Sequence, residues 1–278
     1  MGRTMQVVVI TGVAQGMGRE VARQLASSGV SIAGFDIDEP GVASLRRELE
    51  EGGGQHLLTE LNVTDRKGIL EFKDRVLEAF GHVDLVLSNV GVGFFGPFEE
   101  VDLEKANRCL EINVTGTAAV LQAFLPSMRE RRSGRLIVMS SLVGQIPFPF
   151  ESIYCASKFA VEGLVLSLRY EVEPFGIEVA LIQPAQVSTR FAAKIHTLPP
   201  EGSPYRERVA RFIRRDEELI LGAPDPDTAA AEIVKVLRSP RLKLHNQVDA
   251  KSRFFMRLNR ILPGKLRDAV LLRQMDIR

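Results

Sequence analysis

Tyr154 and Lys158 lie four residues apart in the segment SIYCASK, within a pattern that predicts a helix over residues 152–173. Side chains at this spacing project from the same face of a helix. A free phenol has a pKa of about 10 and is a poor acid–base catalyst at neutral pH. A nearby ammonium favours the phenolate and lowers that pKa. The pair therefore predicts a tyrosine that exchanges a proton with a substrate.

Two polar residues upstream are candidates for the same chemistry. Ser141 ends the segment RLIVMSS, where its hydroxyl is expected to contact a substrate oxygen beside Tyr154. Asn113, in CLEINVTG, lies inside an otherwise good helix, where asparagine competes for backbone hydrogen bonds and bends the helix. A surface asparagine and a chance YxxxK pair are the ordinary alternatives, so each feature alone identifies no reaction.

The segment VVVITGVAQGMGREVARQLA reads as a strand, a glycine turn and an amphipathic helix. Gly12 allows a tight turn, and Gly16 and Gly18 are expected to let the backbone approach a pyrophosphate at the helix N-terminus. Three glycines alone are a weak signal, and their GxxxGxG spacing differs from GxGxxG. Their position between a strand and a helix predicts a dinucleotide site.

Asp36 follows the next apolar run, about 20 residues past the glycines. A carboxylate there accepts hydrogen bonds from the adenosine ribose and repels the 2′-phosphate of NADP. Neither Ile37 nor Asp38 is basic, and Gln15 precedes Gly16, so no base is expected to hold a phosphate. The cofactor predicted is NAD. The alternative is a turn or helix-capping aspartate, a role better suited to Asp38.

Short apolar runs alternate with helical patterns along the chain. Strands are predicted over residues 6–10, 31–35, 56–61, 83–87, 135–139, 177–182 and 242–248. Helices are predicted over residues 18–28, 42–51, 65–80, 104–131, 152–173 and 226–238. Strands that are apolar throughout are typical of a parallel sheet covered on both faces. The pattern predicts one α/β domain over residues 1–278, with a Rossmann-type, doubly wound parallel sheet of about seven strands.

The composition is that of an ordinary globular protein, with 45% hydrophobic and 26% charged residues and a net charge of +1. This charge gives no reason to expect nucleic acid. No apolar run reaches the roughly 18 residues that a membrane-spanning helix needs. Cys109 and Cys155 are far apart and lack metal-ligand spacing. We therefore expect reduced thiols, no metal and a cytoplasmic location.

Two later segments have a distinctive composition. Residues 186–226 are polar and contain prolines, which suits a lid over a site. From Lys235 to the end, the chain contains twelve basic residues and only three acidic ones. The basic C-terminal extension, residues 249–278, is expected to be a solvated helical surface, with contact to an anionic membrane as the alternative.

Five motifs in this order resemble the short-chain dehydrogenase/reductase family over roughly residues 5–190. They are TGVAQGMG (11–18) with Asp36, SNVG (88–91), Asn113, Ser141 and YCASK (154–158). The resemblance implies that Tyr154 is the general acid/base. Lys158 would lower its pKa and bind the nicotinamide ribose. Ser141 would polarise the carbonyl or alcohol, and Asn113 would hold a water in a proton relay.

The resemblance also implies a set of residues that bind NAD. The set comprises Gly12, Gln15, Gly16, Met17, Gly18, Asp36, Asn62, Val63, Asn89, Gly91, Tyr154, Lys158, Pro184, Val187 and Thr189. Three positions depart from the family pattern: SNVG replaces NNAG, Asn62 replaces an aspartate that meets the adenine, and Ala185 replaces a glycine. These departures fall at the cofactor site and leave the order of the family motifs intact.

Within the family the chain is most similar in appearance to the 17β-hydroxysteroid and retinol dehydrogenase branch, through SKFAVEGLVLSLRYEVEPFGIEVALIQPAQVST and DPDTAAAEIVKVLRSPRLKLHNQV. Aromatic residues follow two predicted strands, where doubly wound sheets bind ligands. A bulky apolar substrate, of steroid, retinoid or long-chain type, would contact Phe94, Phe95, Phe148, Phe150, Ser141 and Tyr154. The alternative is that the rings only pack the loops.

The predicted function is an NAD(H)-dependent oxidoreductase that interconverts a secondary alcohol and a ketone. A sugar or polyol dehydrogenase is the alternative enzyme, and a catalytically silent dinucleotide-binding regulator is the alternative from another class. The partners expected are a small-molecule alcohol or ketone and further copies of the chain. The resemblance implies a homodimer or homotetramer, because the family commonly pairs the helices that here hold Asn113 and Tyr154.

Overall fold

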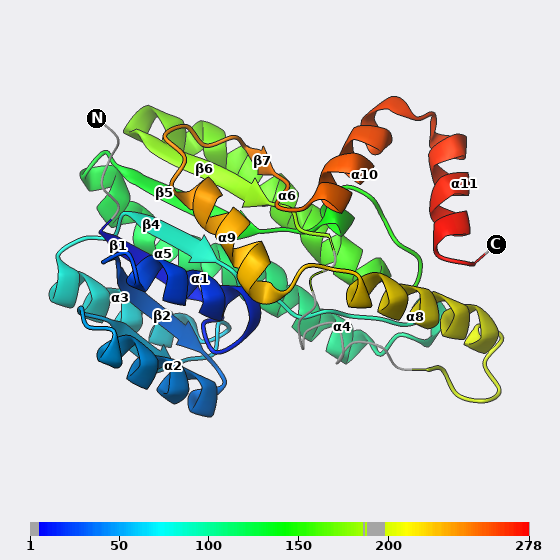
Figure 1. Ribbon diagram of the computed structural model, residues 1–278, viewed down its shortest axis with the longest axis horizontal. Helices are drawn as coiled ribbons and strands as arrows, with labels where there is room; N and C mark the ends of the chain where they lie inside the picture. The colour runs from blue at the N-terminus through cyan, green and yellow to red at the C-terminus, as the bar shows by residue number, and fades with distance from the viewer. Residues whose placement is uncertain (1–5, 186, 188–197, 278) are drawn as a thin grey trace.

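The computed structural model describes residues 6–185, 187 and 198–277. Seven parallel strands form one sheet in the order β3-β2-β1-β4-β5-β6-β7. The strands are β1 (Val7–Thr11), β2 (Ser31–Asp36), β3 (Leu57–Glu60), β4 (Leu85–Ser88), β5 (Gly134–Met139), β6 (Ile177–Ile182) and β7 (His245–Asn246). Figure 1 shows the strands side by side with helices in front of and behind them. The predicted doubly wound parallel sheet is confirmed.

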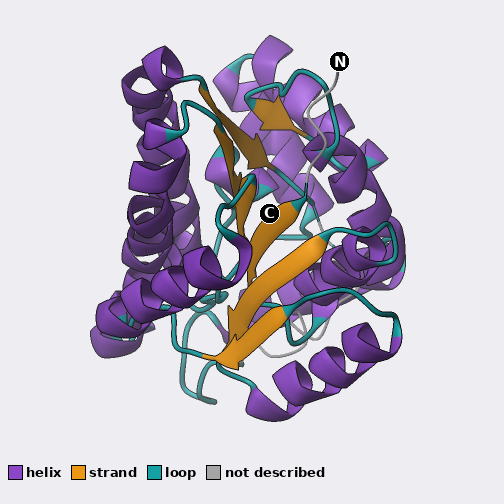
Figure 2. Ribbon diagram, turned by 90° about the vertical axis from the view of Figure 1, so that its left-hand side faces the viewer, coloured by secondary structure: helices purple, strands orange, loops and turns teal. Residues whose placement is uncertain are grey.

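Helices cover both faces of this sheet, as Figure 2 shows. They are α1 (Gly16–Ala26), α2 (Glu39–Glu51), α3 (Arg66–Phe80), α4 (Leu103–Leu110), α5 (Thr117–Glu130), α6 (Ser152–Val172), α8 (Arg206–Leu221), α9 (Pro226–Leu237), α10 (Ala250–Ile261) and α11 (Gly264–Gln274). On one face, α1, α2 and α9 bury a core with the strands. On the other face, α3, α5 and α6 bury a second core. Strands apolar throughout are the consequence of this double cover.

Aspartate side chains begin five of the helices. Each accepts a hydrogen bond from a backbone N–H of the first turn, which an N-cap residue satisfies in place of the missing intrahelical partner. The caps are Asp38 for α2, Asp65 for α3, Asp102 for α4, Asp225 for α9 and Asp249 for α10. The capping role expected for Asp38 is therefore confirmed, which leaves Asp36 as the acid at the end of β2.

The single helix predicted over residues 104–131 is interrupted. A π-helical segment, Glu111–Gly116, separates α4 from α5. Asn113 lies in this segment, and its side chain bonds to the backbone of Val92 instead of to its own helix. A π-turn changes the register of the helical hydrogen bonds, and such turns are frequent at functional sites. The bend expected from a mid-helix asparagine thus takes this form.

The last strand is much shorter than the predicted residues 242–248. β7 pairs with β6 only at His245 and Asn246. It is an edge strand with one neighbour, and the chain turns away into α10, which Asp249 caps three residues later. The apolar run therefore predicts a longer strand than the part of it that pairs at this sheet edge.

The segment expected to form a lid contributes a helix beside the sheet. Its described part contains α8, while residues 186 and 188–197 lie outside the described residues. The basic extension forms α10 and α11, which Figure 1 shows at the same end of the molecule as α8. Within the described residues, no helix has the length and apolar character to cross a membrane.

The end of the extension is not solvated as expected. Met275 and Ile277 are fully buried against Phe212 of α8. Met256 of α10 is also buried, against Leu142 and Ile146 of the loop after β5. Many of the basic side chains remain exposed, among them Arg253, Arg257, Arg260, Lys265 and Arg273. The extension is amphipathic, and its apolar side covers the protein.

Candidate active site

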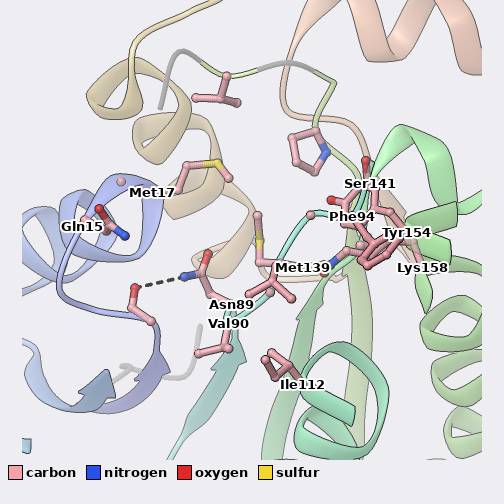
Figure 3. Close-up of a pocket in the computed structure, with 18 of the residues that line it drawn as sticks. Gln15, Met17, Asn89, Val90, Phe94, Ile112, Met139, Ser141, Tyr154 and Lys158 are labelled. Atoms are coloured by element: carbon pink, nitrogen blue, oxygen red, sulfur yellow. Dashed lines mark hydrogen bonds between the residues drawn. The ribbon is translucent and has the colours of Figure 1, made fainter. Parts of the chain in front are cut away.

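A cleft of about 870 Å³ opens at the carboxyl ends of the strands. The loops that follow β1 and β4 line it together, and these two strands are neighbours at the centre of the sheet. The strand order reverses between them, since β2 and β3 lie on one side and β5 and β6 on the other. Doubly wound sheets bind ligands in the crevice at such a switch point. Figure 3 shows the residues that line this cleft.

The glycine turn forms one wall. Gly12 has a φ of +74° and its N–H donates to the carbonyl of Phe35, 2.8 Å away. Asn89 fixes the turn from β4, donating through Nδ2 to the carbonyls of Thr11 and Gly12 at 3.0 and 3.2 Å. Helix α1 begins at Gly16, with φ of +59°, and its N-cap residue Gln15 provides no side-chain hydrogen bond. The N–H groups of the first turn are thus left for an anionic ligand.

Gly18 does not line the cleft, although a pyrophosphate contact was predicted for it. A Cβ at this position would lie 2.1 Å from the carbonyl oxygen of Gly12 and 2.6 Å from Nδ2 of Asn89. Glycine is required here because α1 packs directly on the turn. Gln15, Gly16 and Met17 do line the cleft, as expected.

Asp36 lies at the end of β2 and lines the cleft. Its carboxylate accepts hydrogen bonds from the N–H groups of Ala14 and Asp38, at 3.0 and 3.1 Å. This places a negative charge directly beside the glycine turn. Such a site suits ribose hydroxyls and disfavours an additional phosphate.

A base also lines this end of the cleft, and the sequence reasoning missed it. Arg19, in the first turns of α1, donates to Ser44 and lies 2.9 Å from a carboxylate oxygen of Glu48. The expectation that no base holds a phosphate rested on Gln15, Ile37 and Asp38 and did not consider Arg19. The charge of this guanidinium is already paired.

The residues expected at the adenine and at the middle of the cofactor lie along the same cleft. Asn62, Val63, Asn89 and Gly91 all line it. The amide oxygen of Asn62 accepts from both the N–H and the hydroxyl of Thr64, which holds the turn after β3. A Cβ at Gly91 would lie 3.4 Å from Nζ of Lys158. The glycine therefore keeps the space beside the lysine open.

Asn113 supports the loop after β4 and does not reach into the cleft. Its side chain is 1% exposed, and it exchanges hydrogen bonds with the N–H and carbonyl of Val92 at 2.8 and 2.9 Å. Nδ2 also donates to Ser157 of α6, 2.9 Å away. The amide is therefore committed to protein partners, and a water held in a relay would have to bind the backbone of the π-helical segment.

Ser141, Tyr154 and Lys158 meet at the other end of the cleft, as Figure 3 shows. Ser141 caps the short 3-10 turn Leu142–Gly144 after β5, and its hydroxyl hydrogen-bonds to Tyr154. Lys158 donates to the carbonyl of Met139 at 2.8 Å, and its Nζ is 5.8 Å from the centre of the Tyr154 ring. The three residues predicted from sequence are brought together.

The pKa of Tyr154 is raised, against the expectation that the lysine would lower it. Burial is the largest cause, the nearby carboxyl of Glu151 adds to it, and the hydrogen bond from Ser141 acts in the opposite direction. Burial also lowers the pKa of Lys158 to about 8, although Cys109 and Glu162 oppose this shift. Burial outweighs the lysine because both groups lose solvation when charged. The phenol therefore holds its proton.

A family profile matches the chain across these motifs. The profile described as short chain dehydrogenase covers residues 6–198, which is well over half of the protein. The protein belongs to the short-chain dehydrogenase/reductase family.

The chain is similar over 92% of its length to 17-beta-hydroxysteroid dehydrogenase type 1 of Mus musculus, with 34% identity over 269 residues and 75% of the relative covered. A short-chain dehydrogenase/reductase from Burkholderia phymatum, solved in complex with NAD, has a TM-score of 0.81 and 25% identity, with 93% of this chain and 94% of that chain covered. An alcohol dehydrogenase from Thermococcus sibiricus, complexed with 5-hydroxy-NADP, has a TM-score of 0.72 and 27% identity, with 88% and 95% covered. The family branch predicted from the sequence is confirmed.

The predicted aromatic wall is half correct. Phe94 and Phe148 line the cleft, whereas Phe95 and Phe150 do not. These two rings pack with Phe212 of α8, at centroid distances of 5.4 and 5.8 Å. They turn away because α8 offers a buried apolar surface, and stacking against it removes two large rings from water.

The residues expected after β6 are only partly described. Pro184 and Val187 line the cleft. Thr189 lies outside the described residues.

Two acidic residues at the substrate end were not found from the sequence. Glu151 precedes α6 and Asp216 lies on α8, and both line the cleft. Burial raises the pKa of Glu151 to about 8, and the charge of Asp216 adds to this shift. Glu151 stands three residues before Tyr154, a spacing that puts it near the same helix face. This spacing could have identified Glu151 from the sequence. No sequence feature indicates Asp216, because only the fold brings α8 to the cleft.

Proposed function

We propose that this protein is an NAD(H)-dependent oxidoreductase that interconverts a secondary alcohol and a ketone. The observation that carries the proposal is the set of Ser141, Tyr154 and Lys158 at one end of the switch-point cleft. The other end holds a helix N-terminus without a side-chain cap and an acid beside it. These features fit a dinucleotide along the cleft and a substrate at Tyr154.

The roles of the side chains follow from their positions. Tyr154 donates its proton to the carbonyl oxygen in reduction and accepts one from the alcohol in oxidation. Ser141, bonded to the phenol, orients that same oxygen. Lys158 supplies an ammonium beside the tyrosine and binds the nicotinamide ribose. The cofactor, when bound, supplies the nicotinamide carbon that donates or accepts hydride.

NAD is preferred over NADP in this proposal. The carboxylate of Asp36 lies beside the glycine turn, where we expect the adenosine ribose to bind, and the nearby Arg19 is paired with Glu48. An acid at this point favours ribose hydroxyls. The structural relatives described above include complexes with both nucleotides, so the argument rests on these side chains.

The proposed substrate is bulky and largely apolar. Phe94, Phe148, Val187 and Ile220 are among the apolar residues that line the cleft. A concave site with apolar walls and few polar groups suits such a molecule. The similarity to a relative named a 17-beta-hydroxysteroid dehydrogenase supports the same class.

The proposed enzyme forms a homodimer or homotetramer in the cytoplasm. Phe159, Leu166 and Tyr170 are 45%, 37% and 67% exposed along one side of α6. Among the exposed positions of this helix only Glu171 is charged, and it lies beyond Tyr170 at the end of the stripe. An uncharged, partly aromatic stripe of this kind is typical of an interface. The two free cysteines support a reducing compartment.

Replacing the general acid/base tests the proposal. Tyr154→Phe removes the phenolic proton and is expected to lower kcat by at least about a hundredfold, the usual contribution of general acid–base catalysis. NADH affinity, measured by fluorescence titration, should stay close to that of the wild type. A panel of steroid, long-chain and polyol alcohols with NAD, followed by NADH absorbance, identifies the substrate class. Full activity in the variant overturns the mechanism, and an inactive wild type with intact NADH binding indicates a silent regulator.

A further inference from the structure

A buried carboxylate lies directly behind the proposed active site. Glu162 is 4% exposed and stands one helical turn after Lys158 on α6. A buried charge is costly unless donors surround it. Four donors do so. They are the Ser140 hydroxyl at 2.5 Å, Nε2 of Gln183 at 2.8 Å, Nε2 of Gln145 at 3.2 Å and Nε2 of His245 at 3.1 Å.

Three of these donors come from the ends of adjacent strands, and the fourth, Gln145, follows the 3-10 turn Leu142–Gly144. Ser140 follows β5 and immediately precedes Ser141. Gln183 follows β6 and immediately precedes Pro184, which lines the cleft. His245 belongs to β7. One carboxylate therefore ties β5, β6 and β7 to the helix that carries Tyr154 and Lys158.

The network is closely packed as well as fully bonded. A Cβ at Gly144 would lie 2.7 Å from the hydroxyl oxygen of Ser140 and 3.1 Å from Cγ of Glu162. The backbone of Gly144 is not in the left-handed region, so the neighbouring side chains impose the glycine. Close packing of this kind leaves the Ser140–Ser141 segment little freedom to move.

Two titratable groups are coupled to this carboxylate. Its charge raises the pKa of Lys158 and thereby opposes the effect of burial on that lysine. His245 lies within ion-pair distance on the opposite side. The remaining three partners are neutral donors, so the negative charge acts mainly on these two residues.

We propose that Glu162 is a positioning residue for the dehydrogenase reaction. Its carboxylate fixes Ser140, and hence the hydroxyl of Ser141, and it places a negative charge one helical turn from Lys158. The proposal rests on the function proposed above. It assigns to Glu162 no contact with substrate or cofactor.

Glu162→Gln tests this role with little change in volume. The amide replaces one acceptor oxygen with a donor, so the four hydrogen bonds cannot all persist, and the charge is lost. We expect kcat to fall roughly tenfold to a hundredfold, as for a small displacement of a catalytic group. The loss of NADH affinity at alkaline pH should begin at lower pH, because Lys158 loses its charge more readily. A purely structural role would leave this pH profile unchanged.

Three further variants make the result decisive. Glu171→Gln, at an exposed position of the same helix, should match the wild type in all readouts. Glu162→Asp keeps the charge and should restore the alkaline limb of the NADH profile. Ser140→Ala keeps the carboxylate and should lower kcat without moving that limb, and it serves if Glu162→Gln fails to fold.

The outcomes separate this proposal from the proposed function. An active wild type with unchanged kcat and pH profile in Glu162→Gln overturns the positioning role alone. Unchanged kcat in Ser140→Ala overturns it as well. A wild type without dehydrogenase activity overturns the proposed function. The substrate panel and the Tyr154→Phe variant test that function without reference to Glu162.

Discussion

Tyr154 carries its proton in an environment that opposes ionisation. Burial and the neighbouring Glu151 both raise its pKa, and only the hydrogen bond from Ser141 lowers it. A protonated phenol is the form that donates to a ketone oxygen. We therefore expect reduction to proceed at neutral pH and oxidation to need a higher pH, since only the ionised phenol accepts a proton.

Glu151 should make the stability of the protein depend on pH. Its pKa is raised to about 8 in the folded protein, against about 4.3 for an unperturbed glutamate. Between these values the unfolded chain releases a proton that the folded protein keeps. The contribution of Glu151 to stability is therefore full below about pH 4 and is lost as the pH rises to about 8.

Glu151→Gln removes this titration. The variant should lose less stability than the wild type between about pH 5 and about pH 8, in thermal unfolding followed by fluorescence or calorimetry. Glu50→Gln, an exposed position on α2, should behave as the wild type. Parallel pH profiles for Glu151→Gln and the wild type would show that the carboxyl ionises normally.

Asp36 sets the cofactor preference that we propose. Asp36→Ala removes the charge that repels a 2′-phosphate, so NADP affinity should rise at least roughly tenfold while NAD affinity falls. Fluorescence titration with NADH and NADPH measures both. Asp38→Ala is the matched control two residues away: it removes the N-cap of α2 and should cost about 1 kcal/mol of stability without changing cofactor preference. A wild type that already prefers NADPH would contradict the assignment.

At the scale of elements, the C-terminal residues hold α8 in place. Arg208, Arg211 and Arg215 of α8 donate to backbone carbonyls of Ile277, Asp276 and Gln274, at 3.1, 3.0 and 3.0 Å. Gln274 is the last residue of α11, and Asp276 and Ile277 follow it, where few intrahelical donors remain. Because α8 also presents Asp216 and Ile220 to the cleft, the extension shapes the substrate end from behind.

Replacing the buried end of the extension should therefore affect substrate binding. Met275→Ser removes a fully buried side chain from the surface of Phe212 and is expected to loosen α8. KM for the substrate should rise about tenfold, and the affinity for NADH should change little. Leu266→Ser, half exposed on α11, is the control and should have no effect. Steady-state kinetics measure both variants. Equal KM values for Met275→Ser and the wild type would show that the extension does not affect substrate binding through α8.

At two element boundaries, tertiary contacts override the structure that the local sequence pattern predicts. The helix expected over residues 104–131 has suitable residues throughout, but Asn113 bonds to Val92 and forces a π-turn. β7 ends after two residues because only one neighbour pairs with it. In both cases the deciding partner is distant in sequence, so periodicity alone cannot reveal it.

At the scale of the whole molecule, α6 has two apolar sides. One side packs on the sheet through Val161 and Val165, and the other exposes Phe159, Leu166 and Tyr170.

Contact of the basic extension with an anionic membrane stays a separate prediction. It is favoured by Phe254 and Ile261, which are exposed beside the basic residues of α10.

Leu166→Glu tests whether the exposed side of α6 is an interface between copies. A carboxylate buried at a symmetric contact meets its own copy or an apolar surface, so the dimer should dissociate roughly a hundredfold more readily. Analytical ultracentrifugation over a range of concentrations measures this change. Leu70→Glu, half exposed on α3, should leave the assembly intact. A wild type that is monomeric throughout would overturn the proposal.

The sequence by itself determined the family, the doubly wound sheet and the set of Ser141, Tyr154 and Lys158. These follow from short-range patterns: apolar runs, turn glycines and fixed spacings, which local chemistry imposes. Only the tertiary structure decided which phenylalanines face the cleft, that Gly18 serves packing, and that Arg19, Glu151, Asp216 and Glu162 surround the site. Their positions depend on burial and on partners far away in the chain. The pKa of Tyr154 is raised, and not lowered as expected, for the same reason. Desolvation of the phenol arises only once the chain has folded around it.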